Sequence, residues 1–390
     1  MKKNILYLEG MRGIAALIVV VSHFFQLFLP ATLVSGQNLE HTKYEAMIRS
    51  NPLNFFYNGN FSVCLFFILS GYVLSARFFQ TKDETSFYQT ALKRYPRLAI
   101  PAFISVFIGF LISASHLSFF ETIQPITSTL MQNPFEQHHS LIDTFYHGFI
   151  LNFFHYESTY NPVLWTMTYE LFGSFLIFSF LWLVGKHTIR YAVYIVLIVC
   201  FIQSYYLAFI LGLILSDFTH SSLFQQMQTK KNLIFLTIMT IIGIYFSTYP
   251  YVNVQDTIYE PLRLFGDTFP YLGFYHILGA FGLFVVVLLS NTCQTFFSHP
   301  ICTYIGKLSF SLYLIHFSIL FTFSSYVFSF FISYFSYGLS FLCTVLVSIP
   351  LLWIVSHVFY QFVDAKLTSF LSSIFSFRKK YSFNPSKKDT

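Results

Sequence analysis

Residues 13–30 read GIAALIVVVSHFFQLFLP, a run without a single Asp, Glu, Lys or Arg. A helix that crosses a bilayer needs about 20 predominantly apolar residues. This run comes within a few residues of that length, and similar runs recur along the chain. The sequence therefore predicts helices that lie in a membrane.

The composition of the whole chain agrees with this interpretation. Of 390 residues, 55% are hydrophobic and 10% are charged, whereas soluble domains carry about 25% charged residues. We therefore exclude a soluble fold and expect one membrane domain over residues 1–364, followed by a basic cytoplasmic tail over 365–390. The formal net charge of +6 then reflects orientation and attraction to anionic lipid headgroups. No nucleic-acid partner is expected.

The apolar runs predict an all-α polytopic membrane protein with about ten spanning helices. Two neighbouring runs are short of a full span, so the alternative is that they form one helix. The expected spans are 13–30, 61–79, 98–115, 162–184, the short pair 189–203 and 205–217, 233–250, 270–290, 308–331 and 337–362.

The distribution of basic residues distinguishes ten spans from nine. Cytoplasmic loops of membrane proteins are enriched in Lys and Arg. With ten spans and the N-terminus inside, 19 of the 22 basic residues lie on the cytoplasmic side, whereas merging the short pair would place 11 of them outside. Ten spans with both termini in the cytoplasm is therefore the preferred prediction.

Two ionisable residues, His23 and Glu170, are expected in the middle of the membrane, where such groups are energetically unfavourable and usually functional. Arg12 and His23 share one helix face and are separated by about 16 Å of helix rise. If Arg12 lies at the cytoplasmic boundary, His23 lies near mid-depth. Glu170, eight residues after Pro162, reaches about the same depth from the outer face. We therefore expect Glu170 to contact His23 and to make its imidazole a stronger base.

A pair of arginines precedes the third span. Arg94 and Arg97 flank Pro96 in KRYPRLAIPAF, at the predicted cytoplasmic mouth of the bundle. Guanidinium groups bind phosphate in bidentate geometry, so the pair is a candidate phosphate site. The alternative is that both arginines only contribute to the positive-inside signal.

Two further histidines fall at similar depth on other predicted helices. His316 lies about 13 Å along its helix from Lys307, with Tyr313 one turn before it, and His276 lies about 9 Å below the outer face. His276, His316 and Tyr313 are candidates for binding an acceptor or supporting the site. For either histidine alone, a structural partner is an equally good explanation. We expect no metal site, because the histidine and cysteine spacings match no ligand pattern.

Five motifs together resemble the acyltransferase-3 family of membrane acyltransferases, which O-acetylate surface polysaccharides. In chain order they are LEGMRGIAALIVVVSHF, FFILSGYVLSARF, KRYPRLAIPAF, LWTMTYELF and GKLSFSLYLIHF. The resemblance covers nearly the whole chain. It implies that His23 is the catalytic residue and that Arg12, Arg94 and Arg97 contact acyl-CoA. In many relatives the last helix ends with an acidic residue followed closely by proline. In YQFVDAKLTSF the acidic residue, Asp364, is present but no proline follows it closely, which leaves the role of Asp364 open.

The resemblance also implies a function and a location. The protein would take an acetyl or longer acyl group from cytoplasmic acyl-CoA to a hydroxyl of a sugar or surface glycan outside the bacterial inner membrane. Acetyl-CoA would be the donor substrate, and no bound cofactor is expected. We expect His23, oriented by Glu170, to act as general base on the acceptor hydroxyl; the alternative is that His23 acts as nucleophile and forms a transient acyl-His23 intermediate.

A secondary transporter and a scaffold without chemistry are the two alternatives to an acyltransferase. A proton-coupled secondary transporter also uses mid-membrane His and Glu residues, but such proteins usually contain two related halves. Residues 1–195 and 196–390 share no matching pair of motifs. A scaffold without chemistry leaves the buried His23 and Glu170 unexplained. The acyltransferase hypothesis therefore accounts for more of the sequence.

Overall fold

A computed structural model describes residues 3–36, 38–81, 85–136, 140–230, 233–252, 254–255, 257–265 and 272–381. Within these ranges every regular element is helical, which confirms the all-α prediction. Part of the predicted tail, residues 382–390, and the first two residues of the predicted span 270–290 lie outside the described residues.

Six helices in the described part of the chain are long and apolar enough to cross a membrane. Two of them continue through a single π-helical turn into a further helix. The six are α1 (Lys3–Phe28), α3 (Gly59–Thr81), α4 (Thr85–Ala114), α8 (Trp165–Leu183), α15 (Pro300–Ile319) with its extension through η6 (Leu320–Ser324) into α16 (Ser325–Phe331), and α17 (Tyr337–Phe359) with its extension through η7 (Tyr360–Asp364) into α18 (Ala365–Tyr381).

Two further candidate spans are bent pairs of helices. α10 (Tyr206–Thr219) meets α11 (Ser222–Lys230) at 82°, and α13 (Leu272–Leu289) meets α14 (Asn291–Phe297) at 100°. If each bent pair is one span, the described residues contain up to eight. The chain is therefore a multi-pass membrane protein.

The remaining two predicted spans correspond to short apolar helices, α9 (Arg190–Phe201) and α12 (Leu233–Ser247). At about 1.5 Å per residue they are about 18 and 22 Å long, whereas the hydrocarbon core is about 30 Å thick. Each predicted span therefore has a helical counterpart, while the count of ten stays a prediction.

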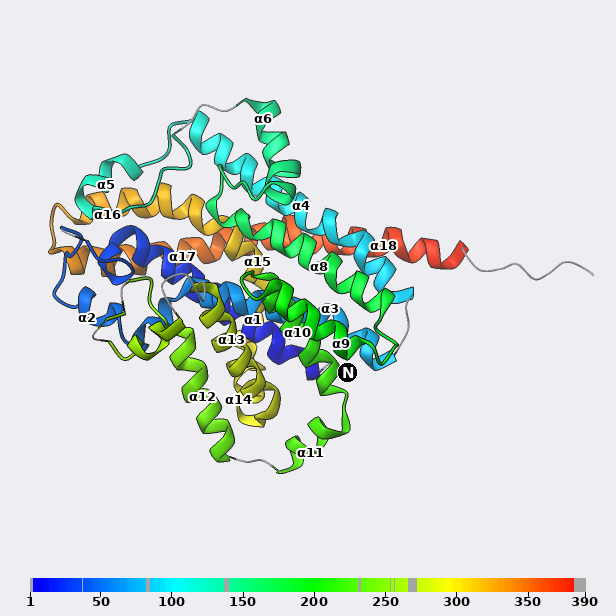
Figure 1. The fold of residues 1–390 in the computed structure, drawn as a ribbon. Helices are drawn as coiled ribbons and strands as arrows, with labels where there is room; N and C mark the ends of the chain where they lie inside the picture. The colour runs from blue at the N-terminus through cyan, green and yellow to red at the C-terminus, as the bar shows by residue number, and fades with distance from the viewer. Residues whose placement is uncertain are drawn as a thin grey trace, which may run out of the picture.

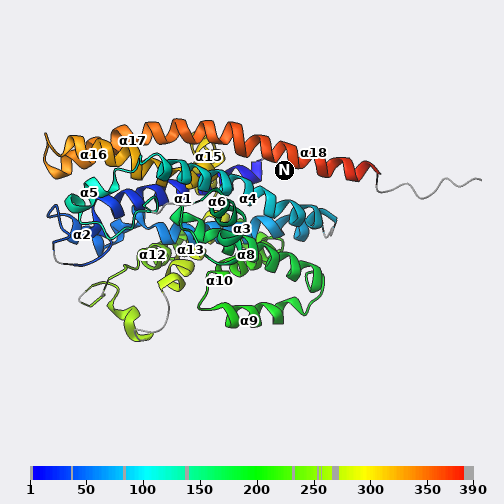
Figure 2. The same cartoon turned by 90° about the horizontal axis from the view of Figure 1, so that it is seen from above.

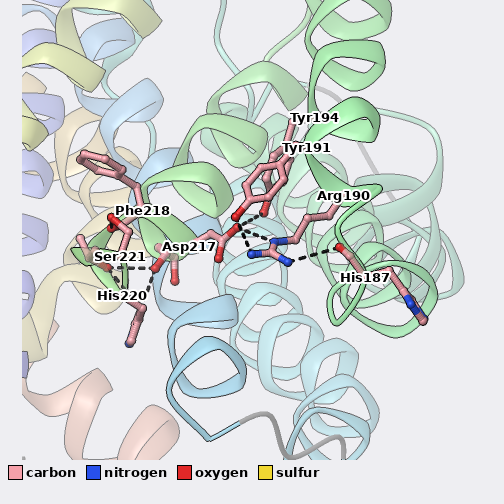
Figure 3. A network of polar contacts seen from close by, with 10 residues as sticks. His187, Arg190, Tyr191, Tyr194, Asp217, Phe218, His220 and Ser221 are labelled. Atoms are coloured by element: carbon pink, nitrogen blue, oxygen red, sulfur yellow. Dashed lines mark hydrogen bonds and ion pairs between the residues drawn. The ribbon is translucent and has the colours of Figure 1, made fainter. Parts of the chain in front are cut away.

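The short helices α9 and α10 form an antiparallel hairpin. Arg190 Nε, at the start of α9, lies 2.8 Å from Asp217 Oδ2, near the end of α10. The Tyr194 hydroxyl donates to the same carboxylate oxygen at 3.2 Å (Figure 3). An ion pair between the first turn of one helix and the last turn of the next requires the chain to reverse between them. Residues 189–217 therefore form two helices, which is the arrangement that ten spans require.

Glycine contacts fix the register between α1 and α15, which run parallel. A Cβ atom on Gly13 would collide with the backbone of Gly306, and one on Gly306 would collide with the carbonyl oxygen of Glu9. Without side chains at these positions the two backbones approach closely. His23 and His316 each lie ten residues further on, about 15 Å along the helix. The glycine contact thereby determines which side chains meet in mid-bundle.

Short segments occupy the end of the bundle away from the chain termini. Figures 1 and 2 show α2 (Glu45–Arg49) and α5 (Phe120–Thr127) at one end, whereas the N-terminus and the end of α18 lie toward the other. The remaining short elements are η1 (Pro30–Thr32), η2 (Pro52–Tyr57), α6 (Leu141–Tyr146), η3 (His147–Leu151), α7 (Asn152–Phe154), η4 (Pro162–Leu164) and η5 (Glu260–Phe265).

Candidate active site

Two cavities lie end to end inside the bundle. The inner cavity has a volume of about 360 Å³ and is lined by Arg12, Arg97, Asp364 and residues of α3, α4, α8 and α15. The outer cavity has a volume of about 740 Å³ and is lined by His23 and by residues of the predicted outer loops. Among the described residues, only Val63 and Tyr313 line both cavities. These two side chains therefore separate the cavities.

The inner cavity collects the arginines. Arg12, Arg94 and Arg97, which the sequence analysis assigned to acyl-CoA, all line it, and Arg77 from α3 joins them. Arg12 also donates to Ser309 Oγ at 3.5 Å. Arg77 is not among the residues predicted to contact acyl-CoA, because nothing in the sequence indicates that the end of α3 faces the same space as α4.

Glu170 pairs with Arg94 rather than with His23. The Arg94 guanidinium donates to Glu170 Oε2 and to Ser174 Oγ at 2.7 Å. The Ser70 hydroxyl donates to the same carboxylate, 2.8 Å from Oε1. The predicted contact between Glu170 and His23 is therefore wrong. The count of helix rise predicts how far along α8 Glu170 lies but not the direction of its side chain. The Glu170 side chain points toward α3, α4 and the inner cavity.

His23 contacts His316 instead. Nδ1 of His23 lies 3.0 Å from Nε2 of His316, and the two rings meet edge to edge, with centroids 5.0 Å apart and planes inclined by 29°. Nδ1 of His316 lies 3.0 Å from the carbonyl oxygen of Leu312, one turn earlier in α15. The Phe317 ring meets His23 edge-on at 4.7 Å. His23 lines the outer cavity, whereas His316 is only 1% exposed.

Tyr313 lies at the boundary between the two cavities. Its hydroxyl donates to the carbonyl oxygen of Val163 at 2.8 Å and lies 2.9 Å from Thr166 Oγ1. These bonds attach the ring to the start of α8. Because Tyr313 precedes His316 by one turn, the boundary lies about 4.5 Å from the histidine pair along the helix axis.

Comparison with known families identifies the chain. Residues 5–357 match a family model, acyltransferase-3, that is described as an acyltransferase domain. The chain belongs to the acyltransferase-3 family. The match includes every described lining residue of both cavities except Asp364, so this acyltransferase-3 protein is a membrane acyltransferase. Neither the curated proteins nor the solved structures gave a match.

The outer cavity of this acyltransferase-3 protein is polar but carries no formal charge from its described lining. No Asp, Glu, Lys or Arg is among those residues. Amides, hydroxyls and aromatic rings line it instead, which can orient a neutral ligand through hydrogen bonds and apolar contact. The polar and aromatic lining consists of Ser22, His23, Gln26, Asn60, Gln132, Asn133, Ser158, Thr159, Trp165, Tyr251, Tyr313 and Phe317.

His276 lies behind this outer cavity. It is fully buried, and its Nε2 lies 2.9 Å from the carbonyl oxygen of Tyr249. Its Nδ1 lies 2.8 Å from the amide nitrogen of Asn60, and the Tyr205 hydroxyl donates to the amide oxygen of Asn60 at 2.6 Å. His276 thus orients Asn60, a lining residue, and does not itself face the space.

Asp364 reaches the inner cavity from the π-helical turn η7. Such turns often occur at functional sites. The carboxylate lies near Arg12 and Arg97 and interacts electrostatically with both. Asp364 therefore lies among the arginines of the inner cavity although no proline follows it closely in the sequence. Among the described residues, no group of three His, Cys, Asp or Glu side chains could hold a metal ion.

Proposed function

We propose that this protein transfers an acetyl group from cytoplasmic acetyl-CoA to a hydroxyl of a sugar or surface glycan on the outer side of a bacterial inner membrane. The observation that carries the proposal is the pair of cavities. An arginine-rich cavity and a polar, uncharged cavity meet beside His23.

The inner cavity suits the donor. The phosphates of coenzyme A cannot enter hydrocarbon, and arginines bind phosphate well because of their fixed charge and planar donors. Arg77 and Arg97 are exposed, whereas Arg12 and Arg94 lie deeper. The rise from Arg12 to His23 is about 16 Å, which is comparable to an extended pantetheine arm. A donor with its phosphates at the arginines would bring its thioester past Tyr313 to His23.

The outer cavity suits the acceptor. A sugar presents many hydroxyls and no charge, and it stacks its apolar face on aromatic rings. Gln26, Asn60 and Asn133 offer both donors and acceptors, and Trp165 offers an aromatic surface in the same lining. The absence of formal charge among the described lining residues favours a neutral sugar unit over an anionic one.

His23 would act as general base. It takes the proton of the acceptor hydroxyl as that oxygen attacks the thioester carbonyl, and the carbon–sulfur bond then breaks. A positioned base accelerates such a step by about 10²–10⁴-fold. Glu170 would act on the donor side, because it orients Arg94 rather than His23.

The test is His23→Ala, with His187→Ala as the matched control, because His187 is exposed and remote in sequence from both cavities. Mass spectrometry of surface glycans from cells that express each variant measures acetyl groups. We expect acetylation to disappear with His23→Ala at unchanged protein level and to persist with His187→Ala. Acetylation that survives His23→Ala would exclude His23 as the base. Glycans that never gain acetyl groups, even with the unchanged protein, would exclude a glycan acceptor.

A further inference from the structure

The proposed base must present a lone pair to the acceptor, and His23 has two ring nitrogens. A neutral imidazole carries one N–H donor and one lone pair. Which nitrogen carries the proton follows from the hydrogen bond made by the other one. Two groups contact the His23 ring and bear on its tautomer: the backbone carbonyl of Val19, one turn earlier in α1, and the ring of His316.

The hydrogen-bond chain begins at Leu312. A carbonyl oxygen only accepts, so His316 Nδ1, 3.0 Å away, must carry the N–H. Neutral His316 then has its lone pair on Nε2. Because Nε2 of His316 lies 3.0 Å from Nδ1 of His23, His23 must donate from Nδ1. The lone pair of His23 is thereby assigned to Nε2.

We propose that His316 is a positioning residue for acyl transfer, which holds His23 in the tautomer that makes Nε2 the base. This inference rests on the proposed function. In many enzymes a carboxylate orients the catalytic histidine, and Glu170 was the candidate for that role. Glu170 is paired with Arg94, so a second imidazole takes the orienting position.

The surroundings suit an imidazole in this position. His316 is 1% exposed, and an ionised carboxylate at such a site would be strongly disfavoured unless paired. A neutral imidazole accepts the hydrogen bond without that penalty. The small angle of 29° between the planes of the two histidine rings suits a hydrogen bond in the ring plane, and the Phe317 ring, with its centroid 4.7 Å from that of His23, packs against the His23 ring.

The transfer step balances with this tautomer. The acceptor hydroxyl gives its proton to His23 Nε2 while its oxygen forms a bond to the thioester carbonyl carbon. The carbon–sulfur bond breaks, and the departing thiolate of coenzyme A takes the proton from Nε2. The products are an ester, the free thiol and neutral His23. Throughout, His23 Nδ1 donates to His316 Nε2, which stabilises the transient positive charge on His23.

Three substitutions at His316 separate positioning from packing. In His316→Gln the side-chain amide oxygen reaches the place of Nε2 and can accept from His23. In His316→Asn the amide reaches only the place of Nδ1, and His316→Leu offers no acceptor. Leu and Gln both come close to His in volume, so a role in packing alone would not favour His316→Gln over His316→Leu.

The assay uses membrane vesicles from cells that express each variant, supplied with acetyl-CoA, and measures the release of coenzyme A thiol. We expect His316→Gln to keep kcat within about tenfold, and His316→Asn and His316→Leu to lose about 100-fold, the range for a misplaced general base. The KM for acetyl-CoA should be unchanged in all three, because the inner cavity is untouched.

Two outcomes would overturn the inference: full activity in His316→Leu, or equal losses in His316→Gln and His316→Asn at equal protein levels. If His316→Asn fails to accumulate, the comparison of Gln with Leu decides. His23→Gln, measured in the same vesicles, separates the two proposals. Activity in His23→Gln refutes His23 as base, whereas an inactive His23→Gln beside an active His316→Leu refutes only the positioning role.

Discussion

At the residue scale, the charges that line the inner cavity are not equivalent. Arg94 is matched by Glu170, while Asp364 lies near Arg12 and Arg97. Four arginines against two carboxylates leave a formal charge of +2 on the described lining. The excess positive charge suits the binding of phosphate, whereas the ion pair of Arg94 with Glu170 links α4 to α8.

This difference predicts that Arg94→Ala acts mainly on stability. The side chains of Arg94 and Glu170 are 15% and 13% exposed, so removing Arg94 leaves a largely buried carboxylate without its charged partner and, among the described residues, with only the Ser70 hydroxyl as a donor. Breaking buried pairs costs about 3–5 kcal/mol, and we expect about 2 kcal/mol because these two groups border a cavity that admits water.

Thermal unfolding in detergent measures this effect, with Arg94→Ala and Glu170→Gln combined as the control. The double variant should unfold at a higher temperature than Arg94→Ala alone, because the unpaired carboxylate is gone. A double variant that is no more stable than Arg94→Ala would show that the ion pair is not what links the helices.

At the scale of elements, the contact between α1 and α15 positions the site. Gly13 and Gly306 allow the two backbones to touch, and the same register brings His23 to His316. Arg12 and Ser309 contact each other from the same two helices. One helix pair therefore positions both the donor end and the reacting end of the proposed site.

Gly306→Ala should therefore reduce activity although Gly306 is remote from the chemistry. Its new methyl group would meet the carbonyl oxygen of Glu9, so α1 must move away from α15. A displacement of about 1 Å in a catalytic group can reduce a rate about 100-fold, and we expect a loss of that order in vesicles supplied with acetyl-CoA.

The matched control is Gly282→Ala in α13, where the nearest atom to an added Cβ is the Cα atom of Gly243 at 3.5 Å. That is an ordinary contact, so activity should stay within about twofold. Equal activity in both variants would mean that α1 can shift without separating the histidines.

The hairpin of α9 and α10 shows how a short apolar helix is held at the edge of the bundle. Besides the ion pair with Asp217, the Arg190 guanidinium lies 4.4 Å from the centre of the Tyr191 ring (Figure 3). Both interactions lie at one end of the hairpin, whereas its turn, residues 202–205, lies at the other. The side of the membrane that exposes this turn decides the topology.

At the scale of the whole molecule, ten spans place the turn outside and residues 185–189 inside. Gln203 and Lys186 are both exposed, so each can be replaced by Cys in a Cys200→Ser background, since Cys200 is itself exposed. A membrane-impermeant maleimide added to intact cells should label Gln203→Cys and leave Lys186→Cys unlabelled. The reverse pattern, or no labelling at Gln203, would contradict ten spans.

The two cavities are also a property of the whole molecule. Helices α1, α3, α4, α8 and α15 contribute to their linings, with Asp364 added from the π-helical turn η7. Tyr313 and Val63 separate a side suited to phosphate from a side suited to neutral hydroxyls. In the proposed reaction this arrangement would let donor and acceptor approach His23 from opposite faces of the membrane.

The sequence by itself determined the features that depend on local physics. Apolar runs predicted the helices, and helix rise placed His23 and His316 at similar depth. Basic residues indicated orientation, and the five motifs identified the family. The family resemblance also grouped Arg12, Arg94 and Arg97, and all three line the inner cavity.

Only the tertiary structure decided which side chains meet. Depth follows from counting residues along one helix, but the direction in which a side chain points between helices depends on packing between distant segments. The contact of Gly13 with Gly306 turns His23 toward His316, while α8 turns Glu170 toward Arg94. No local pattern encodes such pairings, so the partner of the proposed base became visible only in the folded bundle.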